Sequence, residues 1–261
     1  MGYTIKGNLR ASLHIDLYET LDNVQVRVYR VMSALEVAQD LKNQLYKLTA
    51  EMIEQKSENL LGTGFTDADG NYTIDICDAY KEGEIEIDLV VSDINSITRE
   101  KQNPVQFTAR RLNPIWRKVN QNKEFSWNYS FSFQFWDQIR RSFDIWTIVG
   151  NIKSAVDKQT PVAGAIVSVI DVDWIKDDFL GRAVSNRNGK FRIDYKSIDF
   201  KQTYLSPLIS IETPISSFPG PGVYFKITSS DGILLYEEHR SVGKTQERRN
   251  IPRFFNIDLY I

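Results

Sequence analysis

The sequence predicts an all-β protein made of two tandem antiparallel β-sandwiches of about seven strands each, the first with one inserted α-helix. Three observations predict this fold: a heptapeptide that occurs twice, strands with alternating apolar residues, and paired hairpin turns. YTIKGNL at residues 3–9 recurs as WTIVGNI at residues 146–152, 143 positions later. Because ordered internal repeats indicate duplicated units, a chain of 261 residues is expected to hold two copies of one domain.

Further segments of the first half recur in the same order in the second half. They are NVQVRVYRV (23–31) with AGAIVSVIDV (163–172), GTGFTDADGNYTIDI (62–76) with GRAVSNRNGKFRIDY (181–195), EIEIDLVVSD (84–93) with GVYFKITSSD (222–231), and the closing strands WNYSFSFQF (127–135) with RFFNIDLYI (253–261). The spacing between partners varies, as expected when surface loops differ in length.

The strands show the alternation of an antiparallel sandwich. Val24, Val26 and Val28 alternate with polar residues, which buries one face of the strand and exposes the other. Asp69-Gly70 and Asn188-Gly189 are strong hairpin signals, because glycine adopts a positive φ at little cost.

These patterns place one sandwich over residues 1–136 and the other over residues 144–261. The stretch 137–143 between them is predicted to be a short rigid linker, since the join carries Trp136, Ile139 and Phe143 and has none of the residues typical of flexible tethers.

The first copy holds an insertion, residues 33–58, that is predicted to be helical. Apolar residues follow the 3-4 spacing of a heptad stripe at Val31, Ala34, Ala38, Leu41, Leu45, Leu48 and Met52. Two interpretations stay open: the helix lies across its own sheet, or it contacts a neighbouring molecule. In the second case Leu41, Leu45, Leu48 and Met52 are the candidate protein-contact residues.

Composition limits the partners. The net charge of −2 gives no electrostatic reason to expect nucleic acid, and no apolar stretch is long enough to span a membrane. No signal peptide is recognisable, so we expect a protein that is cytoplasmic or released without one. The single cysteine, Cys77, excludes an intrachain disulfide and is expected to be buried as a small apolar residue.

Catalytic and metal-binding patterns are sparse. The two histidines, His14 and His239, do not occupy matching positions and lie in no nucleophile motif, so no catalytic residue and no cofactor is expected. DADGN at 67–71 fails as a calcium loop, because Phe65 and Ile76 would occupy its first and last ligand positions.

An acidic loop in the second copy is a better candidate for a cation. Asp171, Asp173, Asp177 and Asp178 lie within eight residues, and such carboxylates repel one another unless they are solvated, capped or bridged by a metal. Calcium binding and simple solvation both stay open, with Lys176 favouring solvation.

The second copy resembles the transthyretin-like and carboxypeptidase-regulatory-like β-sandwiches. The resemblance rests on PVAGAIVSV (161–169) and AVSNRNGKFRI (183–193); the first copy has the hairpin FTDADGNYTI (65–74) but lacks the Pro-Val-x-Gly-Ala segment. Domains of this kind are often accessory modules that bind partners. The enzymes among them use a terminal Tyr-Arg-Gly-Ser or two Tyr and two His on iron, and these signatures are absent here.

The sequence therefore predicts a non-enzymatic structural or adaptor protein that contacts other proteins in a larger assembly. Its partners are other proteins or a second copy of the chain, through the inserted helix. One alternative is an accessory module that binds glycans or a surface through exposed aromatics such as Trp116, Trp127 and Trp174. A more remote alternative is a transthyretin-related hydrolase.

Overall fold

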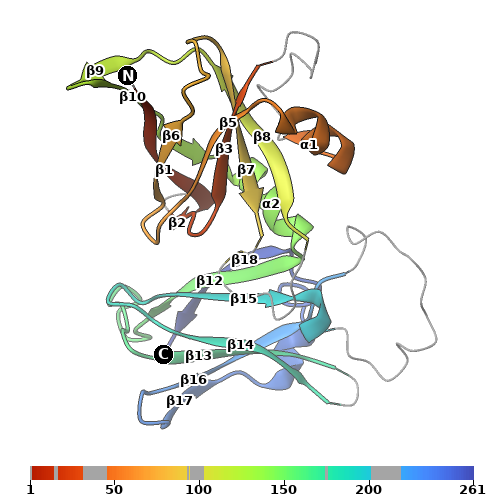
Figure 1. Cartoon of the computed structure of the whole chain (residues 1–261). Helices are drawn as coiled ribbons and strands as arrows, with labels where there is room; N and C mark the ends of the chain where they lie inside the picture. Colours follow the sequence, from red (N-terminus) through yellow and green to blue (C-terminus); the bar gives the residue numbers. More distant parts are fainter. Residues whose placement is uncertain are drawn as a thin grey trace. The chain divides into compact units, whose positions relative to one another are not determined.

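The computed structural model describes residues 2–14, 17–31, 46–92, 94, 103–173, 176–200 and 219–261. Strands dominate these residues, which confirms the all-β prediction (Figure 1). The chain divides into two compact units, Met1–Phe143 and Asp144–Ile261. The strands of each unit form two layers of sheet, so each unit is a β-sandwich.

Unit 1 packs a sheet built on β1 against a five-stranded sheet of order β4-β8-β7-β3-β5. Its strands are β1 (Tyr3–His14), β2 (Leu17–Thr20), β3 (Gln25–Arg30), β4 (Tyr46–Lys47), β5 (Leu60–Phe65), β6 (Asn71–Ile76), β7 (Ile85–Val91), β8 (Val105–Leu112), β9 (Arg117–Val119), β10 (Asn122–Ser126) and β11 (Tyr129–Phe131). Its helices are α1 (Ala50–Ser57) and α2 (Phe133–Ser142). The long strand β1 joins β6 and β10 along its first half, and β2 and β11 along its second half.

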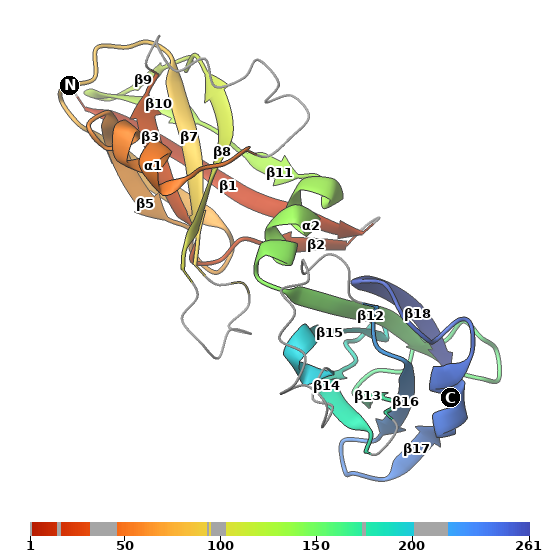
Figure 2. The ribbon, with the colours of Figure 1, turned by 90° about the vertical axis from the view of Figure 1, so that its right-hand side faces the viewer.

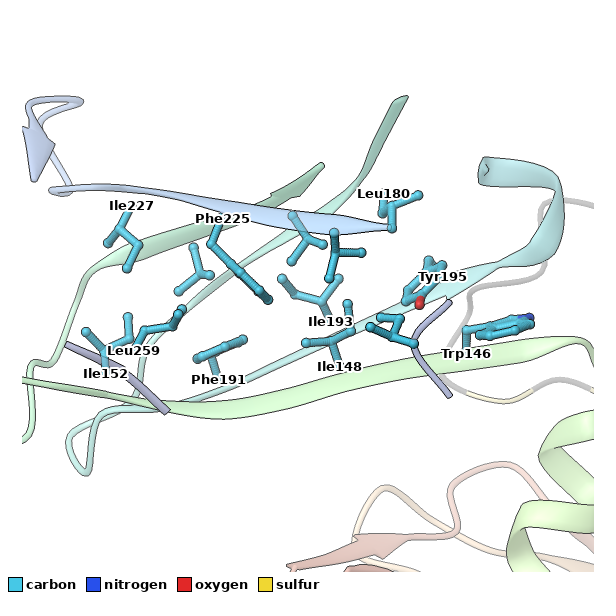
Figure 3. Close-up of a cluster of buried hydrophobic side chains, with 14 of the residues drawn as sticks. Trp146, Ile148, Ile152, Leu180, Phe191, Ile193, Tyr195, Phe225, Ile227 and Leu259 are labelled. Carbon is cyan, nitrogen blue, oxygen red and sulfur yellow. The ribbon is translucent and has the colours of Figure 1, made fainter. Parts of the chain in front are cut away.

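Unit 2 packs the sheet β15-β12-β18 against the sheet β14-β13-β16-β17. Its elements are β12 (Ile145–Lys153), β13 (Ile166–Asp171), β14 (Asp178–Val184), β15 (Lys190–Lys196), β16 (Val223–Thr228), β17 (Leu234–Glu237), β18 (Phe254–Tyr260) and the 3-10 turns η1 (Ser197–Asp199) and η4 (Arg240–Lys244). Figure 3 shows apolar side chains of both sheets meeting in one core, with Ile148 and Phe191 on one side and Phe225 on the other.

The two units match in strand register as well as in strand order. In unit 1, Ile5 lies opposite Ile74 and Gly7 lies opposite Tyr72. In unit 2, Ile148 lies opposite Ile193 and Gly150 lies opposite Phe191. A threonine–aspartate hydrogen bond also recurs across this strand pair, from Thr4 to Asp75 (3.0 Å) and from Thr147 to Asp194 (2.6 Å). The duplication predicted from the sequence is therefore confirmed.

The second sheets match equally well, including an irregularity. β3 pairs with β5 through a register shift after Val28, and β13 pairs with β14 through a shift after Val169. On their other side, Val28 lies opposite Ile87 on β7 and Val169 lies opposite Phe225 on β16. Since a β-bulge bends a strand locally, the shared bulge is further evidence that both units descend from one fold.

The repeated glycine of the opening heptapeptide has a steric role. A Cβ on Gly7 would lie 1.9 Å from the carbonyl oxygen of Trp127, and a Cβ on Gly150 would lie 2.1 Å from that of Ile257. Trp127 therefore corresponds to Ile257.

The paired hairpin turns are confirmed. Gly70 and Gly189 have φ values of +79° and +71°, as the Asp-Gly and Asn-Gly signals require. The side chain of Asp67 accepts hydrogen bonds from the backbone of Asp69 and Asn71 (3.0 and 2.8 Å). Asn186 makes the equivalent bonds in unit 2, to the backbone of Asn188 and Lys190 (2.9 and 3.0 Å).

Each unit differs from a purely antiparallel sandwich, because its first strand also pairs in parallel. β1 runs parallel to β10 and β11, and β12 runs parallel to β18. The first and last strands of each unit are therefore neighbours in one sheet. Alternation of apolar residues shows which face of a strand is buried, but it does not show which strand lies beside it.

The end of unit 1 is helical where a strand and a linker were predicted. The expected strand 127–135 is reduced to β11, and α2 then covers most of the expected linker 137–143. Ser132 caps the helix, and Trp136, Ile139 and Arg140 form its buried face. Figure 2 shows α2 lying alongside β1, on which it packs.

The predicted helix 33–58 is confirmed only in part over its described second half, where a helix is present but is shorter than predicted. Residues 46–47 form the strand β4, and Thr49 caps a helix of only eight residues, α1. Leu48 is buried within unit 1 and Met52 is half-buried, while Leu41 and Leu45 lie outside the described residues. The heptad stripe therefore does not continue through Leu48 to Met52 as one helix.

Candidate functional site

Helix α1 covers the outer face of the five-stranded sheet in unit 1, and one charged side chain holds it there. Lys56 is the only buried residue of α1. Its Nζ lies 2.5 Å from Oδ2 of Asp88, contacts Glu86, and lies 4.6 Å from the centre of the Tyr29 ring. The centre of this contact is therefore a buried ion cluster.

Neighbouring strands complete the cluster around Asp88. Gln106 on β8 donates from Nε2 to Oδ2 of Asp88 (2.7 Å), and Arg111 donates from Nε to Glu86 (2.6 Å). Burial raises the pKa of the Asp88 carboxyl, and the Lys56 ammonium offsets only part of that rise. Oδ1 of Asp88 is buried without a hydrogen-bond partner. This cluster was not predictable from the sequence, because its charged residues come from α1, β7 and β8, which are far apart along the chain.

The equivalent face of unit 2 carries a different set of side chains. Its central row runs across the sheet through Arg182, Ser168, Lys226 and Glu237. Lys226 takes the place of Asp88, because Asp88 lies opposite Arg27 on β3 as Lys226 lies opposite Ser168 on β13. The side chains of Lys226 and Glu237 are about two-fifths exposed and lie 3.4 Å apart.

Apolar residues lie on both sides of this charged row. On one side, Ile166 lies between Val184 on β14 and Thr228 on β16, and Thr228 lies opposite Leu234. On the other side, Ile170 lies between Phe179 and Tyr224. The exposed members of the first row and its adjoining hairpin form what we call the apolar patch: Val184, Ile233, Leu234 and Leu235, which are 63%, 65%, 51% and 47% exposed.

The four aspartates of the acidic loop have different surroundings. Asp171 is buried, its Oδ1 accepts a hydrogen bond from the backbone N of Gly222 (2.7 Å), and burial raises its pKa to about 7. Asp177 is ion-paired with Arg240 (2.7 Å) and accepts a hydrogen bond from Tyr224 (3.1 Å). Burial would raise the pKa of Asp177, but these two hydrogen bonds outweigh burial and lower it.

Asp173 and Asp178 do not complete a metal site with these residues. The backbone N of Asp173 donates to Asp177 (3.2 Å), and Oδ2 of Asp178 is buried without a partner. Within the described ranges, no three His, Cys, Asp or Glu side chains are grouped so that they could hold a metal.

Two of the three tryptophans predicted to bind glycans, Trp127 and Trp116, pack against other aromatic rings. Trp127 is buried and stacks on Tyr129 (5.4 Å between ring centres). Trp116 is half-buried and makes edge contacts with Tyr3 and Tyr80 (4.9 and 5.7 Å). Trp174 lies outside the described residues.

The remaining sequence candidates are divided between the two units. His239 caps the turn η4, where its ring accepts a hydrogen bond from the backbone of Ser241, and His14 ends β1 in the other unit. Cys77 is exposed, so the prediction that it is buried was wrong. It lies just after β6, where the inward alternation of that strand ends at Ile76. No helix among the described residues is long and apolar enough to cross a membrane.

No known protein family matches the chain, and no curated protein is similar to it in sequence. Among solved structures, the shaft pilin SpaA of Lactobacillus rhamnosus GG is 10% identical, with a TM-score of 0.30 over 99% of this chain and 97% of that one. The basal pilin SpaE of the same organism is 12% identical, with a TM-score of 0.29 over the whole of both chains.

A 9R-lipoxygenase from Cyanothece PCC8801 is 14% identical over 45% of this chain, with a TM-score of 0.27, and the match spans 16% of its own length. Likenesses of this strength assign neither a family nor a function to this chain.

Proposed function

We propose that this chain is a structural or adaptor protein that binds another protein, or a second copy of itself, through the outer face of the β14-β13-β16-β17 sheet. The apolar patch carries the proposal. Its four side chains are each about half exposed or more, and three of them are consecutive at one hairpin. Val184 and Leu234 lie in one row across the sheet, with Ile166 and Thr228 between them. Apolar residues grouped on one face in this way mark protein-contact sites, whereas apolar residues that are scattered singly do not.

The rest of the chain agrees with a scaffold role. Each unit has a well-filled core, and unit 1 covers its equivalent sheet face with its own helix. The resemblance to transthyretin-like and carboxypeptidase-regulatory-like sandwiches belongs to this proposal too, because such domains are often accessory modules. An additional contact through Leu41 and Leu45 stays part of the proposal.

The test compares the full chain with the variant Val184→Ser/Leu234→Ser/Leu235→Ser as tagged bait in the cells that produce it. Light scattering on the purified proteins measures self-association in parallel. The matched control is Val156→Ser/Ile198→Ser, which removes two apolar side chains of unit 2 that are 95% and 62% exposed outside the patch.

We expect a bound protein, or the self-associated state, to be lost with the patch variant and kept with the control. Equal recovery and equal mass for all three proteins would overturn the proposal.

A further inference from the structure

The two units offer a comparison that bears on the partner of the apolar patch. Their second sheets are equivalent strand by strand, and in unit 1 the outer face already has an occupant, α1. The occupied face therefore serves as a template for the equivalent face of unit 2.

The template shows how charge selects the occupant. In unit 1 the sheet presents Glu86 and Asp88, and the helix inserts the ammonium of Lys56 between them. Met52 and Ile53 of α1 are half-buried, and Lys56 is its one fully buried residue, so its ion pairs with the sheet are the most buried contact that positions this helix. A helix of eight residues is too short to be stable alone and depends on such a contact.

In unit 2 the charge at the same place is reversed. Lys226 replaces Asp88, and Tyr224 replaces Glu86. Arg182, which is exposed on the edge strand β14, lies two strands from Lys226 in the same row, with the small Ser168 between them. Glu237 neutralises one of these two cations in part, which leaves the row with a net positive charge.

The space above Ser168 lies between two basic side chains and next to two apolar rows. Residues two apart on a strand are separated by about 7 Å, which is close to the roughly 5.4 Å of one helical turn, so a helix that lies along the strands meets the three rows with residues about one turn apart. An occupant that fits all three rows has an acidic side chain in the middle and apolar side chains one turn to either side.

We propose that the outer face of unit 2 binds a partner helix that places an acidic side chain between Arg182 and Lys226 and apolar side chains on the apolar patch and Phe179. This inference rests on the proposed function and names the chemistry of its partner. It is the charge-reversed counterpart of the contact that α1 makes in unit 1.

The test uses two synthetic hydrocarbon-stapled helical peptides as probes. Both carry leucines one turn before and one turn after a central position, and they differ only in having Glu or Lys at that position. Each peptide is titrated into the full chain and followed by fluorescence anisotropy. Because an ion pair near the surface contributes up to about 1 kcal/mol, we expect the Glu peptide to bind about fivefold more tightly than the Lys peptide.

Charge reversal on the protein supplies the second arm. The variant Arg182→Glu/Lys226→Glu is expected to prefer the Lys peptide, whereas the control Arg187→Glu/Lys190→Glu, with two exposed basic residues at the β14–β15 turn, keeps the original preference. The patch variant is expected to bind neither peptide.

Three results would overturn the inference: equal binding of the two peptides, binding of neither, or a preference that the Arg182/Lys226 reversal leaves unchanged. If one of these peptide results occurs while the patch variant still fails to capture the protein that the wild type binds, the partner is not a helix with a central acidic side chain. The proposed function would then still stand. Unchanged capture by the patch variant would instead refute the proposed function itself.

Discussion

The ammonium of Lys56 lies 2.5 Å from the carboxylate of Asp88, and both residues are buried. This pair attaches α1 to the sheet of unit 1, and its counterpart in unit 2 is the half-exposed Lys226. One fold therefore presents the same sheet face in two states, covered by its own helix in unit 1 and exposing apolar side chains in unit 2.

Removing the Lys56 ammonium is expected to destabilise unit 1. Lys56→Ala leaves Asp88 and Glu86 buried without their shared cation, and breaking a buried pair in this way costs about 3–5 kcal/mol. Urea unfolding monitored together with hydrogen exchange measures the loss and assigns it to β7, β8 and α1. The control Lys226→Ala changes stability by less than about 0.5 kcal/mol. A Lys56→Ala protein as stable as the wild type would contradict this role.

The repeated glycines are expected to tolerate no side chain. In Gly7→Ala and Gly150→Ala the new Cβ meets a carbonyl oxygen at 1.9 and 2.1 Å, so the parallel strand pair must separate. Forced overpacking of this kind costs about 1–3 kcal/mol or more. The measurement compares the thermal unfolding midpoints of these two variants with that of Gly2→Ala, whose new Cβ meets nothing nearer than 3.3 Å. If all three variants melt alike, the steric explanation of the repeat fails.

Stability is expected to depend on pH through Asp171. Burial raises its pKa to about 7 in the folded chain, against about 4 for an unfolded aspartate. Between these values the folded state holds a proton that the unfolded state lacks. The contribution of Asp171 to stability is therefore complete below about pH 4 and is lost as the pH rises towards 7.

The variant Asp171→Asn measures this contribution, because its amide oxygen still accepts the hydrogen bond from Gly222. Urea midpoints between pH 4 and 8 should fall less steeply with rising pH in the variant than in the wild type. Parallel curves for the two proteins would show that Asp171 does not titrate in this range.

The acidic loop is expected not to respond to calcium. The guanidinium of Arg240 already occupies the carboxylate of Asp177, so a cation entering there must displace an ion pair. Thermal midpoints should be equal in about 1 mM calcium and in chelator, and Arg240→Ala is the variant in which a response would appear first. A saturable stabilisation of the wild-type chain by calcium would restore the metal interpretation.

The sequence predicted the parts of the fold that depend on local rules. Gly70 and Gly189 sit at positive φ where the hairpin signals placed them, and the two opening heptapeptides are equivalent strands with the same register. Turn chemistry and period-2 burial depend on neighbouring residues, so one sequence is enough to show them.

Features that depend on distant partners were not predictable in this way. Phe131, Phe133 and Phe135 alternate as in a strand, yet Ser132 caps a helix. That helix buries Trp136 and Ile139, which lie three residues apart on one helical face. The cluster at Asp88 and the apolar patch likewise join residues from several strands. Only the register of those strands shows that Lys226 replaces Asp88.

The central claim is that the outer face of unit 2 is the contact surface of this protein. Hydrogen–deuterium exchange of the full chain, alone and with the protein that it captures or in its self-associated state, tests the claim most directly. The account predicts slower exchange on binding over Asp178–Val184 and Leu234–Glu237, with α1 and β5 in unit 1 unchanged. Slower exchange confined to unit 1, with β14 and β17 unaffected, would contradict it.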